Sequence, residues 1–193
     1  MIESLSGIFT AFGLSSSAGL NAYLPLLIVA LTARFTNLIT LHSPFDWLTN
    51  WWVIGLLAVL LLIEIVADKV PLVDHANDVI QTVVRPAAGA ILFAANANVV
   101  TDVHPALALG AGLLLAGGVH TAKATVRPVV TATTGGLGNP VVSTVEDIVA
   151  LVVSVMAILL PILTFVALVV LVAVIWRKWR RYKAQRALQT TSM

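Results

Sequence analysis

The stretch WWVIGLLAVLLLIEIVADKVPLVDHANDVIQTVVRP, residues 51–86, combines the two features that set this chain apart. Its first half, residues 51–68, is an apolar run close to the roughly 20 residues that span a bilayer as a helix. It begins with a tryptophan pair, which is typical of membrane interfaces. From Glu64 onward the stretch brings seven ionisable residues into a chain that otherwise has few: Glu64, Asp68, Lys69, Asp74, His75, Asp78 and Arg85. The stretch therefore indicates a membrane helix followed by an unusual concentration of charge.

The composition of the whole chain supports a lipid environment. Of its 193 residues, 59% are hydrophobic and 10% are charged, and the mean hydropathy is +0.99. Soluble domains are about 25% charged, so this chain has too little polar surface to cover a globule in water. The length suits one compact domain. The chain has no cysteine, which excludes disulfides, thiolate metal sites and cysteine nucleophiles.

Apolar stretches of spanning length recur along the chain. They cover residues 5–33, 51–68, 79–100, 106–133 and 144–176. None alternates with a period of two in short separated blocks, as the strands of a membrane barrel do. We therefore expect an all-α, polytopic transmembrane helical bundle of about five spanning segments, forming one domain over residues 1–176.

The first apolar stretch contains a sequence that should break its helix at membrane depth. This sequence, GLSSSAGLNAYLP at residues 13–25, offers the polar side chains of Ser15, Ser16, Ser17, Asn21 and Tyr23. Irregular backbone at that depth is tolerated only inside protein or beside a wet cavity. The alternative is that the small residues serve close helix packing.

Two further signals of helix ends and starts lie in the second half of the chain. The glycine-rich TTGGLGNP, residues 133–140, should end a helix. Ser143, followed three residues later by Glu146, has the spacing of a capping box and predicts a helix start there; the alternative for Glu146 and Asp147 is a role in substrate binding. The last apolar stretch, at 1.5 Å per residue, would be about 50 Å long, so it either tilts strongly or kinks at Pro161.

The ionisable residues fall on helical faces. Glu64 and Asp68 are four residues apart and share a face. Asp74, Asp78, Gln81 and Arg85 form one polar stripe, and His120, Lys123 and Arg127 form a basic stripe on the fourth apolar stretch. Burying either stripe alone would cost several kcal/mol. We therefore expect the acidic stripe, with Glu64 and Asp68 nearby, to face Lys123 and Arg127, either as structural pairs or as the walls of an ion or solute path.

Other chemistry has weaker support. Asp74, His75 and Asp78 are metal-ligand types close together, but no second motif accompanies them, so we expect no metal or cofactor. The only candidates for lipid chemistry are Asp74 with His75, and His120, and no catalytic motif accompanies them, so we do not expect an enzyme. The triplet VRP occurs at residues 84–86 and 126–128, which suggests a weak internal repeat of the kind common in transporters.

The C-terminal residues 177–193 form a basic tail. Its segment RKWRRYKAQR, residues 177–186, holds six of the eleven basic residues, and residues 1–176 carry a net charge of −4. Because the tail follows an apolar run, the positive-inside rule predicts a cytoplasmic C-terminus. Anionic lipid headgroups are a candidate partner of the tail, whereas nucleic acid is not expected at the membrane surface. The N-terminus lacks the basic region of a cleaved signal peptide.

Several blocks resemble a known family. GLSSSAGLNAYLPLL, ADKVPLVDH, VRPAAGA and GGVHTAKATVRPVVTATTGGLGNPVVSTVED are similar to the signature blocks of small bacterial multi-pass membrane proteins grouped as domain of unknown function four-one-two-six. The resemblance covers nearly the whole chain apart from the basic tail. It implies a multi-pass protein of the bacterial inner membrane and carries no established activity.

These observations favour a transporter or channel-like protein for a small ion or solute. The expected path is lined by Glu64, Asp68, Asp74, Asp78, His120, Lys123 and Arg127, with the broken segment at residues 15–25 on one wall. The alternative is a non-transporting scaffold or assembly factor whose charges are structural pairs. The sequence leaves the substrate, the side of the N-terminus and homo-oligomerisation open.

Overall fold

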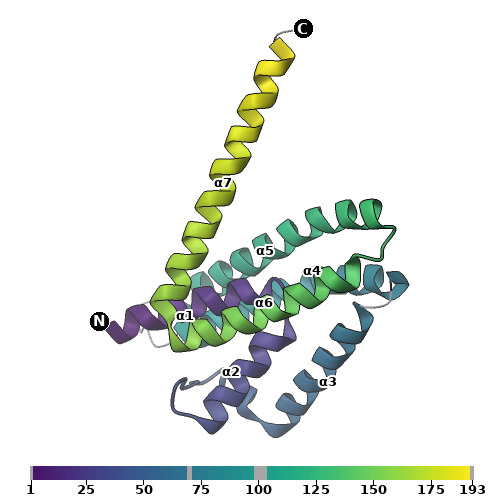
Figure 1. Cartoon of the computed structure of the whole chain (residues 1–193). Coiled ribbons are helices and arrows are strands. Elements are labelled where there is room, and N and C mark those ends of the chain that lie inside the picture. Colours follow the sequence, from purple (N-terminus) through teal and green to yellow (C-terminus); the bar gives the residue numbers. More distant parts are fainter. Residues whose placement is uncertain (1, 69–70, 98–103, 192–193) are drawn as a thin grey trace.

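The computed structural model is all-helical in the part of the chain that it describes (Figure 1). It describes the backbone of residues 2–68, 71–97 and 104–191, and the side chains of these residues except 2–5, 71–76, 78, 97 and 183–191. Its helices are α1 (Ile2–Ala18), α2 (Tyr23–Phe35), the 3-10 helix η1 (Asp46–Thr49), α3 (Trp51–Ala67), α4 (Pro71–Ala97), α5 (Pro105–Thr134), α6 (Asn139–Leu159) and α7 (Pro161–Thr191). The expectation of a helical bundle is confirmed.

The helix ends follow local chemistry. The first apolar stretch breaks between Ala18 and Tyr23, as predicted, and gives α1 and α2. The Asn50 side chain caps α3 by accepting a hydrogen bond from the backbone N–H of Trp52. At the glycine-rich break, Gly135 ends α5 with φ of 61°, a left-handed conformation that favours glycine. The helix boundaries therefore arise mainly from the breaker and capping residues of the sequence.

The last apolar stretch forms two helices instead of one. Leu160 separates α6 from α7, and Figure 1 shows α7 leaving the bundle at a steep angle. Pro161 has no N–H, so it cannot donate to the carbonyl of Ala157, four residues earlier. The hydroxyl of Thr10 in α1 donates to that carbonyl instead, at 3.0 Å. The break is thus stabilised by a neighbouring helix.

The prediction for the start of α6 is wrong. The capping-box spacing of Ser143 and Glu146 predicted a helix start at Ser143, but α6 begins at Asn139. Pro140 occupies the first turn, where its missing N–H costs nothing. Ser143 and Glu146 therefore lie inside the helix, and their side chains are available for tertiary contacts.

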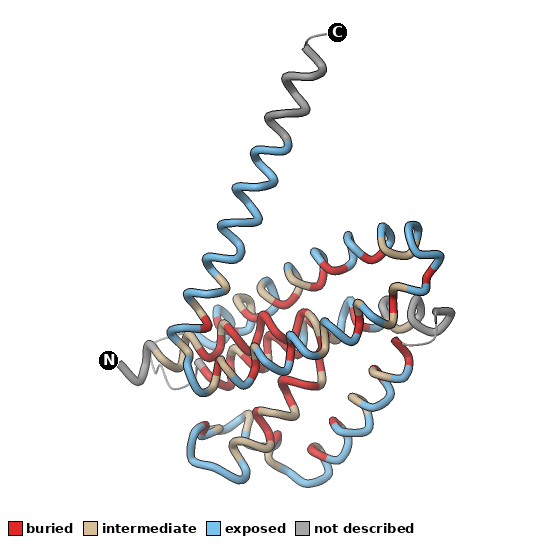
Figure 2. The backbone as a smooth tube through the Cα atoms, viewed as in Figure 1, coloured by how far each residue is buried: buried red, intermediate tan, exposed pale blue. Residues whose placement is uncertain are grey.

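Helix α1 is central to the bundle. It packs against α4, α5, α6 and α7, while α2 and α3 pack together beside them (Figure 1). Figure 2 shows the buried residues concentrated on the facing sides of the central helices. Most of α7 is exposed, including Val170 and Ile175. The apolar residues on the outside of the bundle thus form a surface suited to lipid.

In the described part of the chain, four helices are long and apolar enough to cross a membrane. They cover Val79–Asn96, Pro105–Thr134, Asn139–Leu159 and Pro161–Tyr182. The segment expected at residues 51–68 is the apolar helix α3 of 17 residues, which is at the short end of the range for a span. The apolar α2 has 13 residues. The bundle therefore mixes full-length helices with shorter ones.

Helices α4 and α5 approach closely because both present small residues. A Cβ on Gly89 would overlap the Cβ of Ala116 and would lie 2.8 Å from the carbonyl oxygen of Gly112. Small residues at such contacts allow the backbones to meet, which is a common basis of helix association in lipid. The contact holds α4 and α5 side by side and aligns their polar residues.

The Gly89→Ala variant should be less stable than the parent. The added methyl group must push α4 away from α5, which we expect to cost about 1–3 kcal/mol. Gly110→Ala on α5 is the matched control, because a Cβ there would meet nothing within 4 Å. Thermal unfolding of the purified proteins in detergent measures the difference. Equal unfolding temperatures for the two variants would contradict this packing.

Candidate functional site

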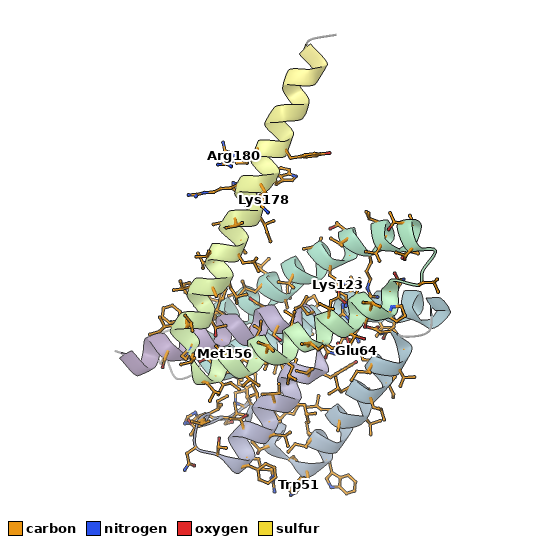
Figure 3. All side chains as sticks on the ribbon, viewed as in Figure 1. Trp51, Glu64, Lys123, Met156, Lys178 and Arg180 are labelled. Atoms are coloured by element: carbon orange, nitrogen blue, oxygen red, sulfur yellow. The ribbon has the colours of Figure 1, made fainter. Side chains whose placement is uncertain are left out.

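A group of polar side chains is buried at the end of the bundle where α5 turns into α6. Figure 3 shows two of them, Glu64 and Lys123, close to this end. We call the group the buried polar cluster; it consists of the buried residues Glu64, Asp68, Gln81, Arg85, His120, Lys123, Arg127 and Ser143, together with the partly buried Glu146. Its members come from α3, α4, α5 and α6, and from the residue that follows α3. The cluster therefore joins four helices.

Glu64 and Arg85 form the most deeply buried ion pair of the cluster. Nη2 of Arg85 lies 3.0 Å from Oε1 of Glu64, and the two side chains are 0% and 1% exposed. Nη1 of Arg85 also lies 3.2 Å from Nδ1 of His120. Arginine only donates, so this ring nitrogen accepts and carries no proton. His120 is therefore neutral, and its Nε2–H can donate to the hydroxyl of Thr82 at 3.2 Å.

Asp68 is the second carboxylate of the cluster and has three described partners. The hydroxyl of Ser143 donates to Oδ2 at 2.8 Å, and the Asn77 amide donates to Oδ1 at 2.9 Å. Nη2 of Arg127 lies 3.4 Å from Oδ2. Asp68 thus connects the end of α3 with α4, α5 and α6.

Lys123 and Glu146 form the third charge pair. Nζ of Lys123 lies 2.7 Å from Oε2 of Glu146, and Arg127 approaches the same oxygen at 3.5 Å. Lys123 also donates to the carbonyl of Leu20, at 3.2 Å, just after the end of α1. A cation is favoured there, because the last carbonyls of a helix have no intrahelical donor. The break in the first apolar stretch therefore reaches the cluster directly.

The polar residues of the broken segment form hydrogen bonds with backbone and side-chain groups, mainly of neighbouring helices. Ser15 donates to the carbonyl of Gly89 at 2.8 Å, and Ser16 donates to Phe12 of its own helix. Ser17 bonds both the Ala150 carbonyl and the Ser154 hydroxyl, each at 2.8 Å. Through Ser15 and Ser17, these contacts join α1 to α4 and to α6.

The last two polar residues of the segment extend toward the cluster. The Asn21 amide donates to Asp147 at 2.9 Å, and its oxygen accepts from the backbone N–H of Leu24. The Tyr23 hydroxyl lies near the side chain of Gln81 on α4. Asn21 therefore tethers the break to α6.

The structure brings together five of the seven predicted path residues. Asp68 meets Arg127, one of the two bases expected to face the acidic residues, whereas Glu64 pairs with Arg85. Glu146 was interpreted as a helix-capping residue, but it is the partner of Lys123. The remaining two predicted residues, Asp74 and Asp78, and the neighbouring His75, have side chains outside the described residues.

Some buried polar atoms of the cluster have no hydrogen-bond partner among the described residues. They include Oε2 of Glu64, Oε1 of Gln81 and Nε of Arg85. An unsatisfied buried polar atom costs about 1–3 kcal/mol, and each such atom in a folded protein needs an explanation. These two acceptors and this donor thus remain available within the cluster.

These features define an integral membrane protein, a helical bundle with ionisable residues inside and apolar residues outside. Residues 8–181 match the family described as "Domain of unknown function (DUF4126)", and the chain belongs to this family. Comparisons with curated proteins and with solved structures give no match. The likeness noted in the sequence blocks is therefore confirmed at the level of the family.

Removing one partner of the Glu64–Arg85 pair should destabilise the protein strongly. The Glu64→Ala variant leaves the Arg85 guanidinium buried without its carboxylate, which we expect to cost about 3–5 kcal/mol. The double variant Glu64→Met/Arg85→Met removes both charges and should recover most of that loss. Unfolding in detergent measures both, with Lys178→Ala on the exposed face of α7 as the control. A double variant no more stable than the single one would argue against the pair.

Proposed function

We propose that this protein moves a small ion or solute across the membrane, along a path that includes the buried polar cluster. The observation that carries the proposal is a set of atoms on Glu64, Gln81 and Arg85 that have no hydrogen-bond partner among the described residues, beside three charge pairs inside the bundle. Ionisable residues inside a membrane protein are costly and usually mark ion or solute pathways. Free donors and acceptors beside them supply groups that a passing ion or solute can contact.

The position of the helix break supports the same proposal. The chain between α1 and α2 lies against the cluster through Leu20 and Asn21. Transporters commonly place their sites beside discontinuous helices, where backbone groups are not all used within the helix. Lys123 holds the Leu20 carbonyl and Glu146 at once, so a shift of Lys123 would change the backbone break and the charge pairs together.

We further propose that the protein resides in the bacterial inner membrane with its C-terminus in the cytoplasm. The apolar part of α7 ends in Trp176 and Trp179, whose rings lie 5.5 Å apart beside the first basic residues. Tryptophan at this position suits a membrane interface, and the basic residues beyond it suit the cytoplasmic side. Lys178 and Arg180 project from the exposed helix (Figure 3), where they can meet anionic lipid headgroups.

The test is flux through proteoliposomes that contain the purified protein. Entrapped indicators report H⁺, Na⁺, K⁺ and Cl⁻, and labelled urea and glycerol report uncharged solutes. The parent should conduct at least one of these, and Glu64→Gln should abolish that flux, because it removes the charge that holds Arg85. Asp46→Asn, which changes an exposed carboxylate in η1, should leave the flux unchanged.

Two outcomes would contradict the proposal. A parent protein that conducts none of the six species would argue against transport of small ions and solutes. Flux through Glu64→Gln equal to that of the parent would exclude the proposed path. Gel filtration of each variant in detergent identifies a change caused by misfolding, and Asp68→Asn, which keeps the shape of the side chain, provides a second variant.

A scaffold or assembly factor is the second candidate, and the close pairing of the charges favours it. Each of the three pairs, Glu64–Arg85, Asp68–Arg127 and Lys123–Glu146, has an N···O distance of 3.4 Å or less. If the charges serve only to hold helices together, exchanging Glu64 and Arg85 should restore the stability that either single reversal removes. That result, with no flux through the parent, would favour the scaffold.

A further inference from the structure

A second polar feature lies at the end of the bundle opposite the buried polar cluster. It is a pocket of about 370 Å³, lined by Ser6, Gly7, Thr10, Leu38, Ile39, Thr40, Asn96, Ile158 and Pro161. In Figure 1 this is the end where α6 meets α7, whereas the cluster lies where α5 turns into α6. The pocket shares no residue with the cluster, and the functional argument above does not use it.

The polar groups that line the pocket are uncharged. They are the hydroxyls of Ser6, Thr10 and Thr40 and the amide of Asn96, and among the residues that the structure describes no ionisable side chain lines the pocket. Helix ends of both signs meet here: α4 and α6 end near the pocket, and α1 and α7 begin near it. The partial charges of helix termini are negative at the C-terminal end and positive at the N-terminal end, so they oppose one another. The pocket therefore favours hydrogen bonding over binding of an ion.

The backbone around the pocket is irregular. Residues 38–40 have no regular secondary structure, and Leu160 interrupts the chain between α6 and α7 beside Pro161. Irregular backbone in a membrane protein needs burial in protein or contact with a water-filled cavity. At about 30 Å³ of liquid volume per molecule, the pocket has room for on the order of ten waters.

A line of hydrogen bonds runs between the pocket and the cluster along the contact of α1 with α6. Thr10 bonds the Ala157 carbonyl at the pocket, Ser17 bonds Ala150 and Ser154 further along, and Asn21 bonds Asp147 beside the cluster. A Cβ on Gly13 would lie 2.6 Å from that of Ala157, so the helices touch closely between these bonds. The two polar ends thus share one tightly packed seam.

We propose that this pocket is a hydrated mouth that admits small uncharged polar molecules and disfavours ions. The role of the pocket as one end of a pathway rests on the proposed transport function. If the pathway exists, the pocket restricts the solutes that enter from this end to uncharged ones. Its hydration and its preference for uncharged molecules do not depend on transport. They follow from the neutral lining and the opposed helix ends.

The chain has no cysteine, so single cysteines can report access to the pocket without a modified background. Ser6→Cys and Thr40→Cys place a thiol in the lining. Ile162→Cys is the matched control, because Ile162 follows the lining residue Pro161 but is 57% exposed on the apolar outside. The reagents are iodoacetamide, which is uncharged, and iodoacetate, its anionic counterpart, with all rates divided by those of free cysteine.

In proteoliposomes, Ser6→Cys and Thr40→Cys should react with iodoacetamide at least about tenfold faster than Ile162→Cys. At Ser6→Cys the normalised rate with iodoacetate should be at least about tenfold lower than with iodoacetamide, because burying a charge costs far more than burying a neutral polar group. Thiols in the pocket that react no faster than the control would overturn its hydration. Equal normalised rates with the two reagents would overturn its preference for uncharged molecules.

The flux assay separates this inference from the proposed function. Selective labelling of the pocket in a protein that conducts nothing would leave the hydrated pocket in place and remove the pathway. If the protein conducts an ion, and labelling of Ser6→Cys leaves that ion flux unchanged, the ion enters elsewhere. That result would overturn the role of the pocket as a mouth. Flux of urea or glycerol that stops after labelling of Ser6→Cys would support both the transport function and the role of the pocket as a mouth.

Discussion

The contact between Glu64 and Arg85 is the interaction on which the interior of this protein depends. Both side chains are almost completely removed from the surface, and an isolated charge at such a position would be strongly unfavourable. Their pairing fixes α3 against α4 and sets the direction of the Arg85 guanidinium, which then holds His120 in its neutral form. Asp68, one turn further along, pairs with the guanidinium of Arg127 on α5. Two carboxylates on one helical face thus hold an arginine from each of the two Val-Arg-Pro triplets.

The interior also requires close packing of the helices, because this packing brings the charged residues near enough to pair. Gly89 and Gly112 allow α4 and α5 to meet, which brings Arg85 and His120 within hydrogen-bonding distance. The serines of α1 serve its contacts with α4 and α6 in the same way. In lipid there is no hydrophobic drive between helices, so such small residues and hydrogen bonds determine which helices associate. The polar cluster and the small-residue contacts are therefore parts of one arrangement.

Much of the fold could be predicted from the sequence, and the errors have physical causes. The break after Ala18, the end of α5 at the glycine-rich segment and the interruption at Pro161 follow from local backbone preferences. The capping-box interpretation of Ser143 and Glu146 failed because a favourable local spacing competes with tertiary partners, and here Asp68 and Lys123 are closer alternatives. Glu64 was expected near the acidic stripe that faces Lys123 and Arg127, and its partner in the structure is Arg85 on α4. The spacing of the polar residues predicted which face of each helix is polar, but it did not predict which helix packs against that face.

The sequence by itself determined the solvent of this protein, its helical class and the places where its helices break, because hydropathy, helix length and breaker residues act locally. The tertiary structure alone decided which acid meets which base, that Glu146 joins the cluster, and that Ser6, Thr40 and Asn96 line one pocket. These contacts join residues far apart in the chain. They depend on how the helices cross and approach, which is set by the packing of all the helices together and has no counterpart in the spacing along any one of them.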